Sequence, residues 1–551
     1  MLRGLLASFS LVGLMMGLLF LCASLTPSLL PRVPLVQGVL SGIAFAVGYG
    51  VGKALLGTYC FLEFKELSGR VRQPIVWGLF VSLAVLTLIT FSRNGVWQNS
   101  IRERMEMPAI DRDYLWLVAG IALVVALVVV FFARAIRYLA HLIGRLLQRV
   151  LPRRTAVVLG ALGAAVLVFV SLNDLVLQRF FQSVDDGFAV IDLVVEDGME
   201  PPVSEVASGG PNSVIDWNDI GFNGKSFLTA GPDRSSIEAF TGRQAQEPIR
   251  VYAGYNSGET FEERAALALQ DLIAMGGFER SVLVVATPTG TGWLDPAAVE
   301  PVAFLQDGDL AIVSLQYSYV PSWLSLIVDP DRSRRAAQAL FDAVYGHWLT
   351  VPDNERPELF AFGLSLGALG SESSADLVTL FNDPIDGALW SGPPFASSVW
   401  ASVTRARNDD SPAWRPEFRD GALVRFMNQD GIANPVDARW GPMRLLYLQY
   451  ASDPMVFFST RLAWNRPDWL EGERGPDISP FFDWYPLVTF LQVAFDIPMA
   501  TSPPSGFGHS YHARDYIEGW VEVMQPEGWT LADTERLQAL YADFEASPSR
   551  P

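Results

Sequence analysis

The chain has 551 residues, of which half are hydrophobic and only 18% are charged, and its formal net charge is −19. Residues 1–173 hold 16 Lys/Arg and 6 Asp/Glu, a net of +10, whereas the remaining residues hold 24 and 53, a net of −29. The acidic part repels phosphate groups, which excludes nucleic acid as its partner. We therefore expect a membrane domain over 1–173, a connector over 174–248 and a soluble domain over 249–551.

The first part contains five apolar stretches, each near the ~20 residues that cross a bilayer core. A cleaved signal peptide is the alternative for the first stretch, but four more follow and "TPSLLPR" is not a small-x-small cleavage site. The sequence predicts an α-helical transmembrane bundle of about five spans, with the lipid bilayer as a partner. The stretches are Leu5–Leu30, Val36–Leu56, Ile75–Phe91, Leu115–Phe132 and Ala156–Leu172.

The orientation of this bundle follows from its basic loops, because Lys and Arg accumulate on the cytoplasmic side. Residues 133–155 carry six arginines and no acidic residue, and their apolar residues recur at helical spacing. This pattern predicts a separate helix lying on the inner leaflet. With five spans, the amino terminus is cytoplasmic and everything after Asn173 lies outside. The spans hold almost no ionisable residue, which favours an anchor over a transporter.

From residue 249 onwards, apolar strand candidates alternate with helical segments. This order predicts a mostly parallel sheet with helices on both faces. Residues 174–248 are punctuated by Gly, Pro and Ser and read as irregular, with a short amphipathic helix near Leu175–Phe188. The expected strands are 249–255, 281–288, 310–319, 358–363, "GALWSG", "LVRFMN" and "RLLYLQYASDP", and the expected helices are 259–275, 332–349, one from about 366, and 513–524.

A serine stands between two glycines where one of these strands gives way to a helix, in Gly363-Leu364-Ser365-Leu366-Gly367. Gly-x-Ser-x-Gly at such a junction is the pattern of a nucleophile turn, and its acid and histidine follow later in the chain. Asp453 ends the strand run "RLLYLQYASDP", and "SGFGHSYHARDY" supplies His509 and His512 before the last expected helix. Histidine suits the base role because its unperturbed pKa is ~6.5, and a carboxylate orients it.

Each of these residues also has a structural interpretation. Ser365 could simply be a small residue at a helix start, and Asp453 could be a turn residue before proline. Asp430 and Asp437 are reserve acids, and His512 could replace His509.

The oxyanion of an acyl-transfer intermediate needs two backbone N–H donors. One is expected from Leu366, directly after the nucleophile, and the other from the flexible loop "TPTGTGW", at Thr289 or Gly290. Glu372 lies two turns into the following helix, where a structural role is expected. We find no metal-ligand spacing and no complete phosphate loop, so the sequence predicts no cofactor.

With these residues in place, the chain resembles the bacterial membrane-anchored α/β-hydrolase family, which joins an N-terminal multi-span region to a C-terminal hydrolase domain. The motifs that carry the resemblance are "SLTPSLLPR", "VLVVATPTGTGWLDP", "QYSYVPSWLS", "ALWSGPPF" and "SDPMVFF". The family's serine motif usually reads Gly-Glu-Ser-Leu-Gly, so Leu364 departs from it. Its Gly-His-x-Tyr pattern matches Gly508–Tyr511, which favours His509.

The resemblance implies serine-hydrolase machinery, and the Lys/Arg bias predicts that the catalytic domain of this bacterial inner-membrane protein lies in the periplasm. Carboxylic esters, lipid-like or acylated, are the expected substrates, and the apolar stretch 317–328 could line an acyl pocket. Acyl transfer by the same triad is an alternative, as is an inactive hydrolase-like domain in a membrane binding or assembly protein, which the Leu364 departure would support.

Overall fold

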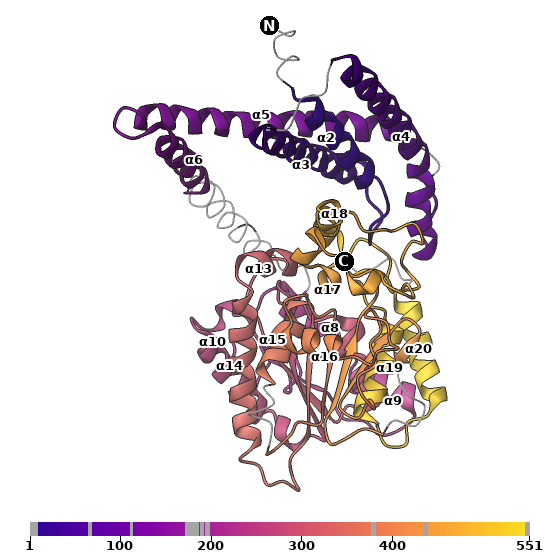
Figure 1. Cartoon of the computed structure of the whole chain (residues 1–551). Helices are drawn as coiled ribbons and strands as arrows, with labels where there is room; N and C mark the ends of the chain where they lie inside the picture. The colour runs from indigo at the N-terminus through magenta and orange to yellow at the C-terminus, as the bar shows by residue number, and fades with distance from the viewer. Residues whose placement is uncertain are drawn as a thin grey trace. The chain divides into compact units, whose positions relative to one another are not determined.

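The computed structural model describes residues 9–63, 69–110, 114–170, 187, 192, 199–375, 382–433 and 439–545. The chain divides into two compact units (Figure 1). The first unit contains Met1–Ser183 together with two later segments, Phe458–Leu470 and Pro476–Met499. The second contains Val184–Phe457, Glu471–Gly475 and Ala500–Pro551. A piece of the second half of the chain therefore packs with the N-terminal helices. The expected amphipathic helix near 175–188 lies outside the described residues, apart from the isolated residue 187.

Four helices of the first unit are long and apolar enough to cross a membrane, within the part of the chain that the structure describes. The prediction of five spans is therefore corrected to about four. The first apolar stretch gives only the 14-residue helix α2, about 21 Å long at 1.5 Å per residue, against a ~30 Å bilayer core. The helices of this unit are α2 (Leu11–Ser24), α3 (Pro34–Phe61), α4 (Gly69–Arg104), α5 (Leu115–Leu147), α6 (Arg153–Val170) and α18 (Val488–Asp496).

The separate surface helix expected after the fourth stretch does not form. α5 runs without a break for 33 residues, from Leu115 to Leu147, and includes the basic segment that begins at Arg134. Leu, Val, Ala and Arg are all compatible with a helix interior, and no proline or helix-ending glycine interrupts the run, so nothing in the chain stops the helix at Phe132.

Two glycine pairs let α3 approach two different helices closely. A Cβ added to Gly38 or Gly42 would come within 2.7 Å of atoms in α5, and one added to Gly48 would lie 2.6 Å from the Met16 carbonyl of α2. At Gly52 the added Cβ would lie 2.7 Å from the Val12 carbonyl. The four-residue spacing within each glycine pair thus allows close helix contacts, as small residues do in membrane bundles.

A buried ion pair ties the α2–α3 link to α18 within the first unit. The Nε of Arg32 donates to Oδ1 of Asp496 at 2.9 Å, and both side chains are fully buried. The backbone N–H of Leu29 donates to the other carboxylate oxygen, and Gln492 donates to the Thr26 carbonyl at 2.9 Å. The motif "SLTPSLLPR" therefore holds a later segment of the chain through desolvated polar contacts.

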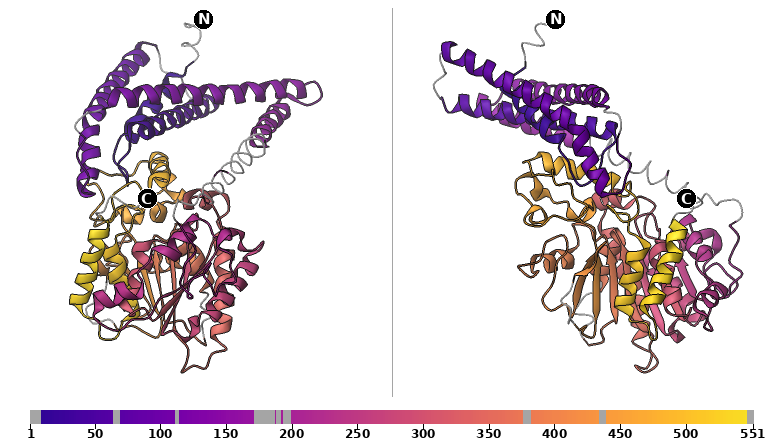
Figure 2. Two further views of the ribbon diagram at one scale, coloured as in Figure 1. Left: turned by 180° about the vertical axis from the view of Figure 1, so that it is seen from behind. Right: turned by 90° about the vertical axis from the view of Figure 1, so that its right-hand side faces the viewer.

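The second unit is built on an eight-stranded sheet in the order β1-β3-β2-β4-β5-β8-β6-β7 (Figures 1 and 2). All neighbouring pairs are parallel except β6 and β7, so the expected mostly parallel sheet is confirmed. The strands are β1 (Ile249–Ala253), β2 (Val282–Thr287), β3 (Leu310–Leu315), β4 (Glu358–Leu364), β5 (Gly387–Ser391), β6 (Val424–Asn428), β7 (Gly431–Ala433) and β8 (Arg444–Leu448).

Alternate side chains of β4 show that helices cover both faces of this sheet. Phe362 packs on Tyr516 and Trp520 of α19 (Ala513–Met524), at ring-centroid distances of 6.3 and 5.8 Å. The next residue, Gly363, faces α15 (Leu366–Ser374). Since neighbouring residues of a strand point to opposite faces, α15 and α19 lie on opposite sides of the sheet.

The remaining helices complete these layers. α10 and α14 pack together on the α15 side, and α12 and α20 pack with α19. They are α8 (Phe222–Ala230), α9 (Arg234–Thr241), α10 (Phe261–Ala274), α11 (Pro296–Val299), α12 (Pro301–Leu305), α13 (Ser322–Val328), α14 (Asp331–Trp348), α16 (Ser398–Arg405), α17 (Pro454–Phe457) and α20 (Leu531–Glu545).

The expected irregular connector is wrong for residues 222–241, which form α8 and α9. Asp233 caps α9 by accepting from the Ser236 N–H, and Gly242 ends it in a left-handed conformation. In addition, Ala207 pairs with Arg250 beside β1. The end of the expected connector is therefore part of the second unit.

Candidate active site

Ser365 occupies a strained turn between β4 and α15. Its backbone has φ 60° and ψ −124°, a region that L side chains rarely adopt. The flanking glycines are required by space, because an added Cβ on Gly363 would lie 2.3 Å from the Gly367 carbonyl carbon. One on Gly367 would lie 2.1 Å from the Thr287 carbonyl oxygen of β2. This is the backbone shape that a nucleophile turn needs.

Asp453 follows β8 and is completely buried. One carboxylate oxygen accepts from the Met455 N–H at 2.8 Å. The other oxygen is 2.6 Å from Nδ1 of His509 and accepts the Tyr511 hydroxyl, also at 2.6 Å. Burial, followed by the neighbouring Asp453 carboxylate, raises the pKa of the Tyr511 hydroxyl well above its usual value, so this hydroxyl stays a donor.

Two backbone contacts hold the loop that carries His509. The N–H of His509 donates to the Ala500 carbonyl at 2.7 Å, and the N–H of Gly508 donates to the Ser452 hydroxyl at 2.9 Å. The second contact joins the histidine loop directly to the segment that carries Asp453. The carboxylate and imidazole are therefore positioned by main chain as well as by each other.

The two candidate histidines have different environments. His509 contacts Asp453, whereas His512 is the N-cap of α19 and accepts from the Arg514 N–H through Nδ1 at 3.0 Å. The N–H of His512 itself donates to the Tyr450 hydroxyl. The geometry thus favours His509 as the triad histidine and gives His512 a capping role.

Gly392 brings the histidine next to the serine turn. β4 and β5 are neighbours, and the Ser365 N–H donates to the Ser391 carbonyl at 2.9 Å. Gly392 follows directly, and a Cβ added there would lie 2.5 Å from Cε1 of His509. The imidazole of His509 therefore lies against the backbone of Gly392, which directly follows Ser391, the residue whose carbonyl accepts from the Ser365 N–H.

No hydrogen bond joins the Ser365 hydroxyl to Nε2 of His509. Both atoms are buried and have no hydrogen-bond partner among the described residues. Catalytic hydrogen bonds are often long before substrate binds, so the arrangement is compatible with a nucleophile and base that meet in the Michaelis complex.

The expected oxyanion donors differ in availability. Leu366 is the first residue of α15, so its N–H has no partner within that helix. The Thr289 N–H donates to the Trp293 carbonyl at 2.9 Å, and the Gly290 N–H donates to the Ser322 hydroxyl at 3.0 Å. A second donor at Thr289 or Gly290 stays a prediction. The N–H of one of these residues would have to leave its present partner in order to donate to the oxyanion.

Glu372 has the structural position expected from the sequence. Its buried carboxylate accepts from the Val399 and Trp400 N–H groups, at 2.8 and 3.1 Å, and from the Tyr447 hydroxyl at 2.9 Å. Burial raises the pKa of Glu372, and these three bonds oppose the shift. The residue therefore fastens the start of α16 to α15.

Of the two reserve acids that the sequence offered, Asp430 does not join the site. Asp430 lies in the turn between β6 and β7, where its N–H donates to the Asn428 side chain. Asp437 lies outside the described residues. No group of three or more His, Cys, Asp or Glu side chains is placed to hold a metal ion within the described ranges.

Sequence reasoning missed the contributions of Tyr511, Gly392 and Ser452. Tyr511 belongs to the Gly-His-x-Tyr pattern, which could have indicated a role beyond the histidine. Gly392 ends the motif "ALWSG", where a glycine directly after a strand is a signal for a close approach. Nothing in the sequence marks Ser452, because its partner is 56 residues away.

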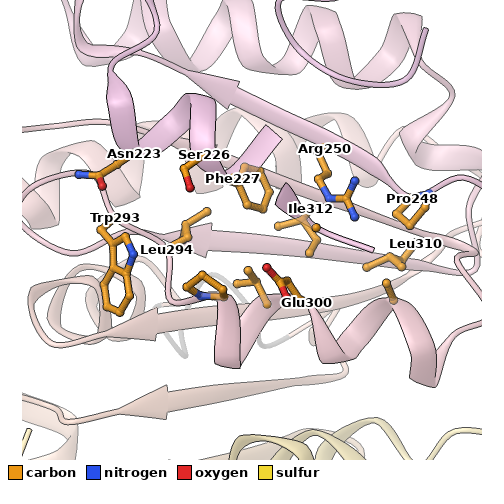
Figure 3. A pocket seen from close by; sticks show the side chains of 14 residues that line it. Asn223, Ser226, Phe227, Pro248, Arg250, Trp293, Leu294, Glu300, Leu310 and Ile312 are labelled. Atoms are coloured by element: carbon orange, nitrogen blue, oxygen red, sulfur yellow. The ribbon is translucent and has the colours of Figure 1, made fainter. Parts of the chain in front are cut away.

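A cavity near β1 is separate from these residues. Figure 3 shows it between α8 and the neighbouring strands, with Asn223, Arg250 and Trp293 among its lining side chains. Its volume of about 20 Å³ holds roughly one water molecule, and none of the triad candidates lines it. It is too small to be the substrate site.

A mostly parallel sheet with a strained serine turn at the carboxyl end of a central strand defines an α/β-hydrolase fold. A family model described as "Alpha/beta-hydrolase family" matches residues 249–537, and one described as "Alpha/beta-hydrolase family N-terminus" matches residues 25–232. The first match covers more than half of the chain, which therefore belongs to the α/β-hydrolase family. This confirms the resemblance seen in the sequence. No curated protein and no solved structure matches the chain.

Proposed function

We propose that the chain is a membrane-anchored serine hydrolase that acts on carboxylic esters of lipid-like or acylated substrates. The observation that carries this proposal is the 2.6 Å contact between His509 Nδ1 and the buried Asp453 carboxylate, beside the strained turn of Ser365. Membership of the hydrolase family supports the reaction class, and the geometry supports the residues.

In the proposed reaction the Ser365 oxygen attacks the ester carbonyl, while Nε2 of His509 takes the hydroxyl proton. Asp453 keeps the proton on Nδ1 and stabilises the imidazolium. His509 then gives its proton to the leaving alcohol as the ester C–O bond breaks, which leaves an acyl-serine. Water attacks this ester with the same proton transfers, releasing the acid and the free hydroxyl of Ser365.

The oxyanion of each tetrahedral intermediate would accept from the Leu366 N–H. The second donor is proposed at Gly290. Its N–H donates to the side-chain hydroxyl of Ser322 and needs only to leave that acceptor for the oxyanion. Loss of one such donor typically costs ~3 kcal/mol of transition-state stabilisation.

The apolar helices support membrane anchoring, and chain continuity supports the orientation. α18 lies between Asp453 and His509 in the sequence and, within the first unit, binds the link between α2 and α3 through Arg32. At nine residues, or about 14 Å, α18 is too short to cross a bilayer. The catalytic residues would therefore lie on the side where α2 ends and α3 begins.

The basic residues gather around the opposite ends of the helices, from the last turns of α5 to the start of α6 and around the connection from α3 to α4. The positive-inside rule makes those ends cytoplasmic, which gives a periplasmic catalytic domain in a bacterial inner membrane. The start of α2 contacts Gly52, next to Lys53, so a cytoplasmic amino terminus follows from the same rule. The proposed periplasmic side of the catalytic domain is the same whether the bundle has four or five spans, whereas a cytoplasmic amino terminus requires α2 to cross as well.

The substrate class rests on the membrane and on apolar residues near the site. In the stretch 317–328, Tyr317 is buried and donates to the Pro288 carbonyl, whereas Ile327 and Val328 of α13 are exposed, at 67% and 48%. Exposed apolar side chains would suit a lipid-like substrate. Acyl transfer would use the same residues with an alcohol in place of water.

A fluorophosphonate probe tests the nucleophile directly. The full-length protein in detergent should be labelled, and Ser365→Ala should not be. Ser373→Ala is the matched control, because Ser373 lies on the same helix and, among the described residues, its hydroxyl only donates to the Leu369 carbonyl. Equal labelling of wild type and Ser365→Ala would remove Ser365 as nucleophile, and no labelling of either would favour the inactive binding protein. Peptide cleavage without ester cleavage would refute the substrate class.

A further inference from the structure

A second cavity lies within the first unit, at the end of the bundle where α3 begins, α4 ends and α5 begins. Its volume is about 210 Å³, enough for a small polar group and several methylenes. Most of its lining surface is apolar and includes Val33, Ile110 and Val118. The helix ends place it at the level where lipid headgroups meet the hydrocarbon core.

Gln98 of α4 supplies an unmet donor at this cavity. Its side chain is 5% exposed, and its Oε1 accepts from the Arg32 N–H at 3.1 Å. That bond fixes the orientation of the amide, because a flipped amide would place NH₂ against an N–H. The Nε2 atom has no hydrogen-bond partner among the described residues. An unpaired buried donor destabilises the protein, and a ligand with an acceptor would recover that loss.

The charge of the lining side chains is positive. Among the residues that the structure describes, two arginines line the cavity and no Asp or Glu does. Arg32 is neutralised by Asp496, so the excess charge comes from Arg102. The Nε of Arg102 donates to the Pro108 carbonyl at 2.6 Å, and no ion pair of its guanidinium occurs among the described residues. An anionic oxygen is therefore the complementary ligand group.

We propose that this cavity binds an anionic phospholipid, with the phosphate oxygens facing Gln98 and Arg102 and the glycerol and upper acyl chain against Val118 and Ile110. A guanidinium beside an unmet amide donor recognises the phosphate, and the apolar walls select a lipid over a free anion. Arginine recognises phosphate oxygens through charge-assisted hydrogen bonds. The inference is independent of the catalytic proposal, because it uses no residue of the second unit.

Native mass spectrometry of the full-length protein in non-ionic detergent tests the proposal, with phosphatidylglycerol as the probe. Wild type should retain the lipid, and Arg102→Gln should bind it about tenfold more weakly, the loss of one charge-assisted hydrogen bond. Gln98→Glu should weaken binding at least as much, since it keeps the acceptor for Arg32 but adds negative charge. Arg104→Gln is the control, because Arg104 is on the same helix end but contacts the Pro476 carbonyl.

The outcomes distinguish specific binding of the lipid in this cavity from non-specific electrostatic attraction of the lipid to the protein. Equal weakening by Arg102→Gln and Arg104→Gln would overturn the proposal, as would equal retention of diacylglycerol, which lacks the phosphate. Inorganic phosphate that competes as well as the lipid would show a free-anion site instead. An unchanged melting temperature of the lipid-free variants confirms that they fold. If Gln98→Glu does not fold, Arg102→Gln, at a half-buried position, still tests whether the cavity binds the lipid.

Discussion

Replacing Gly392 by alanine tests whether the imidazole of His509 acts as the catalytic base, or whether the chain has only the fold of a hydrolase. The added Cβ would lie 2.5 Å from Cε1 and 2.9 Å from Nδ1 of His509. Ordinary contacts begin at 3.4 Å, so the imidazole must retreat by about 0.9 Å. It cannot do so freely, because Nδ1 is 2.6 Å from Asp453 and the His509 N–H is bonded to Ala500. Misplacement of a catalytic group by 1 Å costs ~10²-fold in rate, so kcat/KM should fall by about 10²-fold.

The same substitution carries a backbone cost that needs its own control. Gly392 has φ +54°, and an alanine there costs ~1–2 kcal/mol in stability. Gly242 has φ +69° with nothing within 4 Å of an added Cβ, so Gly242→Ala carries only the backbone cost. Hydrolysis of a short-chain p-nitrophenyl ester, with thermal melting of both variants, makes the comparison. If Gly392→Ala keeps the activity of Gly242→Ala at equal melting temperature, the imidazole is not the base and the site is misassigned.

Two further substitutions test the groups around this site and the anchor of α18. Tyr511→Phe removes a 2.6 Å hydrogen bond to the Asp453 carboxylate, so kcat for ester hydrolysis should fall about tenfold with little change in melting temperature; an unchanged kcat would contradict the positioning role. Arg32→Met leaves Asp496 buried without its cation and should lose about 3–5 kcal/mol of stability. The double variant Arg32→Met with Asp496→Asn should melt higher than Arg32→Met alone, and equal melting of the two would mean that the unpaired carboxylate is not the cause.

Much of the hydrolase-like fold could be predicted because its signals are local. The strands of the parallel sheet are buried on both faces and therefore appear as continuous apolar runs, which is why β1 to β6 and β8 were expected close to their observed positions. α8 and α9 were missed because they are only nine and eight residues long, too short for a clear period.

The membrane region shows the limit of hydropathy. Apolar composition identified the helices but not where they end, so the stretch at Leu5–Leu30 was expected to span and α5 was expected to stop at Phe132. Helix ends depend on caps and on packing, and α2 ends where residues 25–33 turn to bind α18. That partner lies more than 460 residues later in the chain, beyond the reach of any local pattern.

The sequence by itself determined the order serine, acid, histidine, the glycines of the serine turn and the apolar character of the N-terminal helices, because each depends on neighbouring residues. Only the tertiary structure decided that His509 and not His512 meets Asp453, that Tyr511 shares the same carboxylate oxygen, and that Arg32 binds Asp496. These choices depend on which segments the sheet and the helix bundle bring together, and distance along the chain carries no information about that.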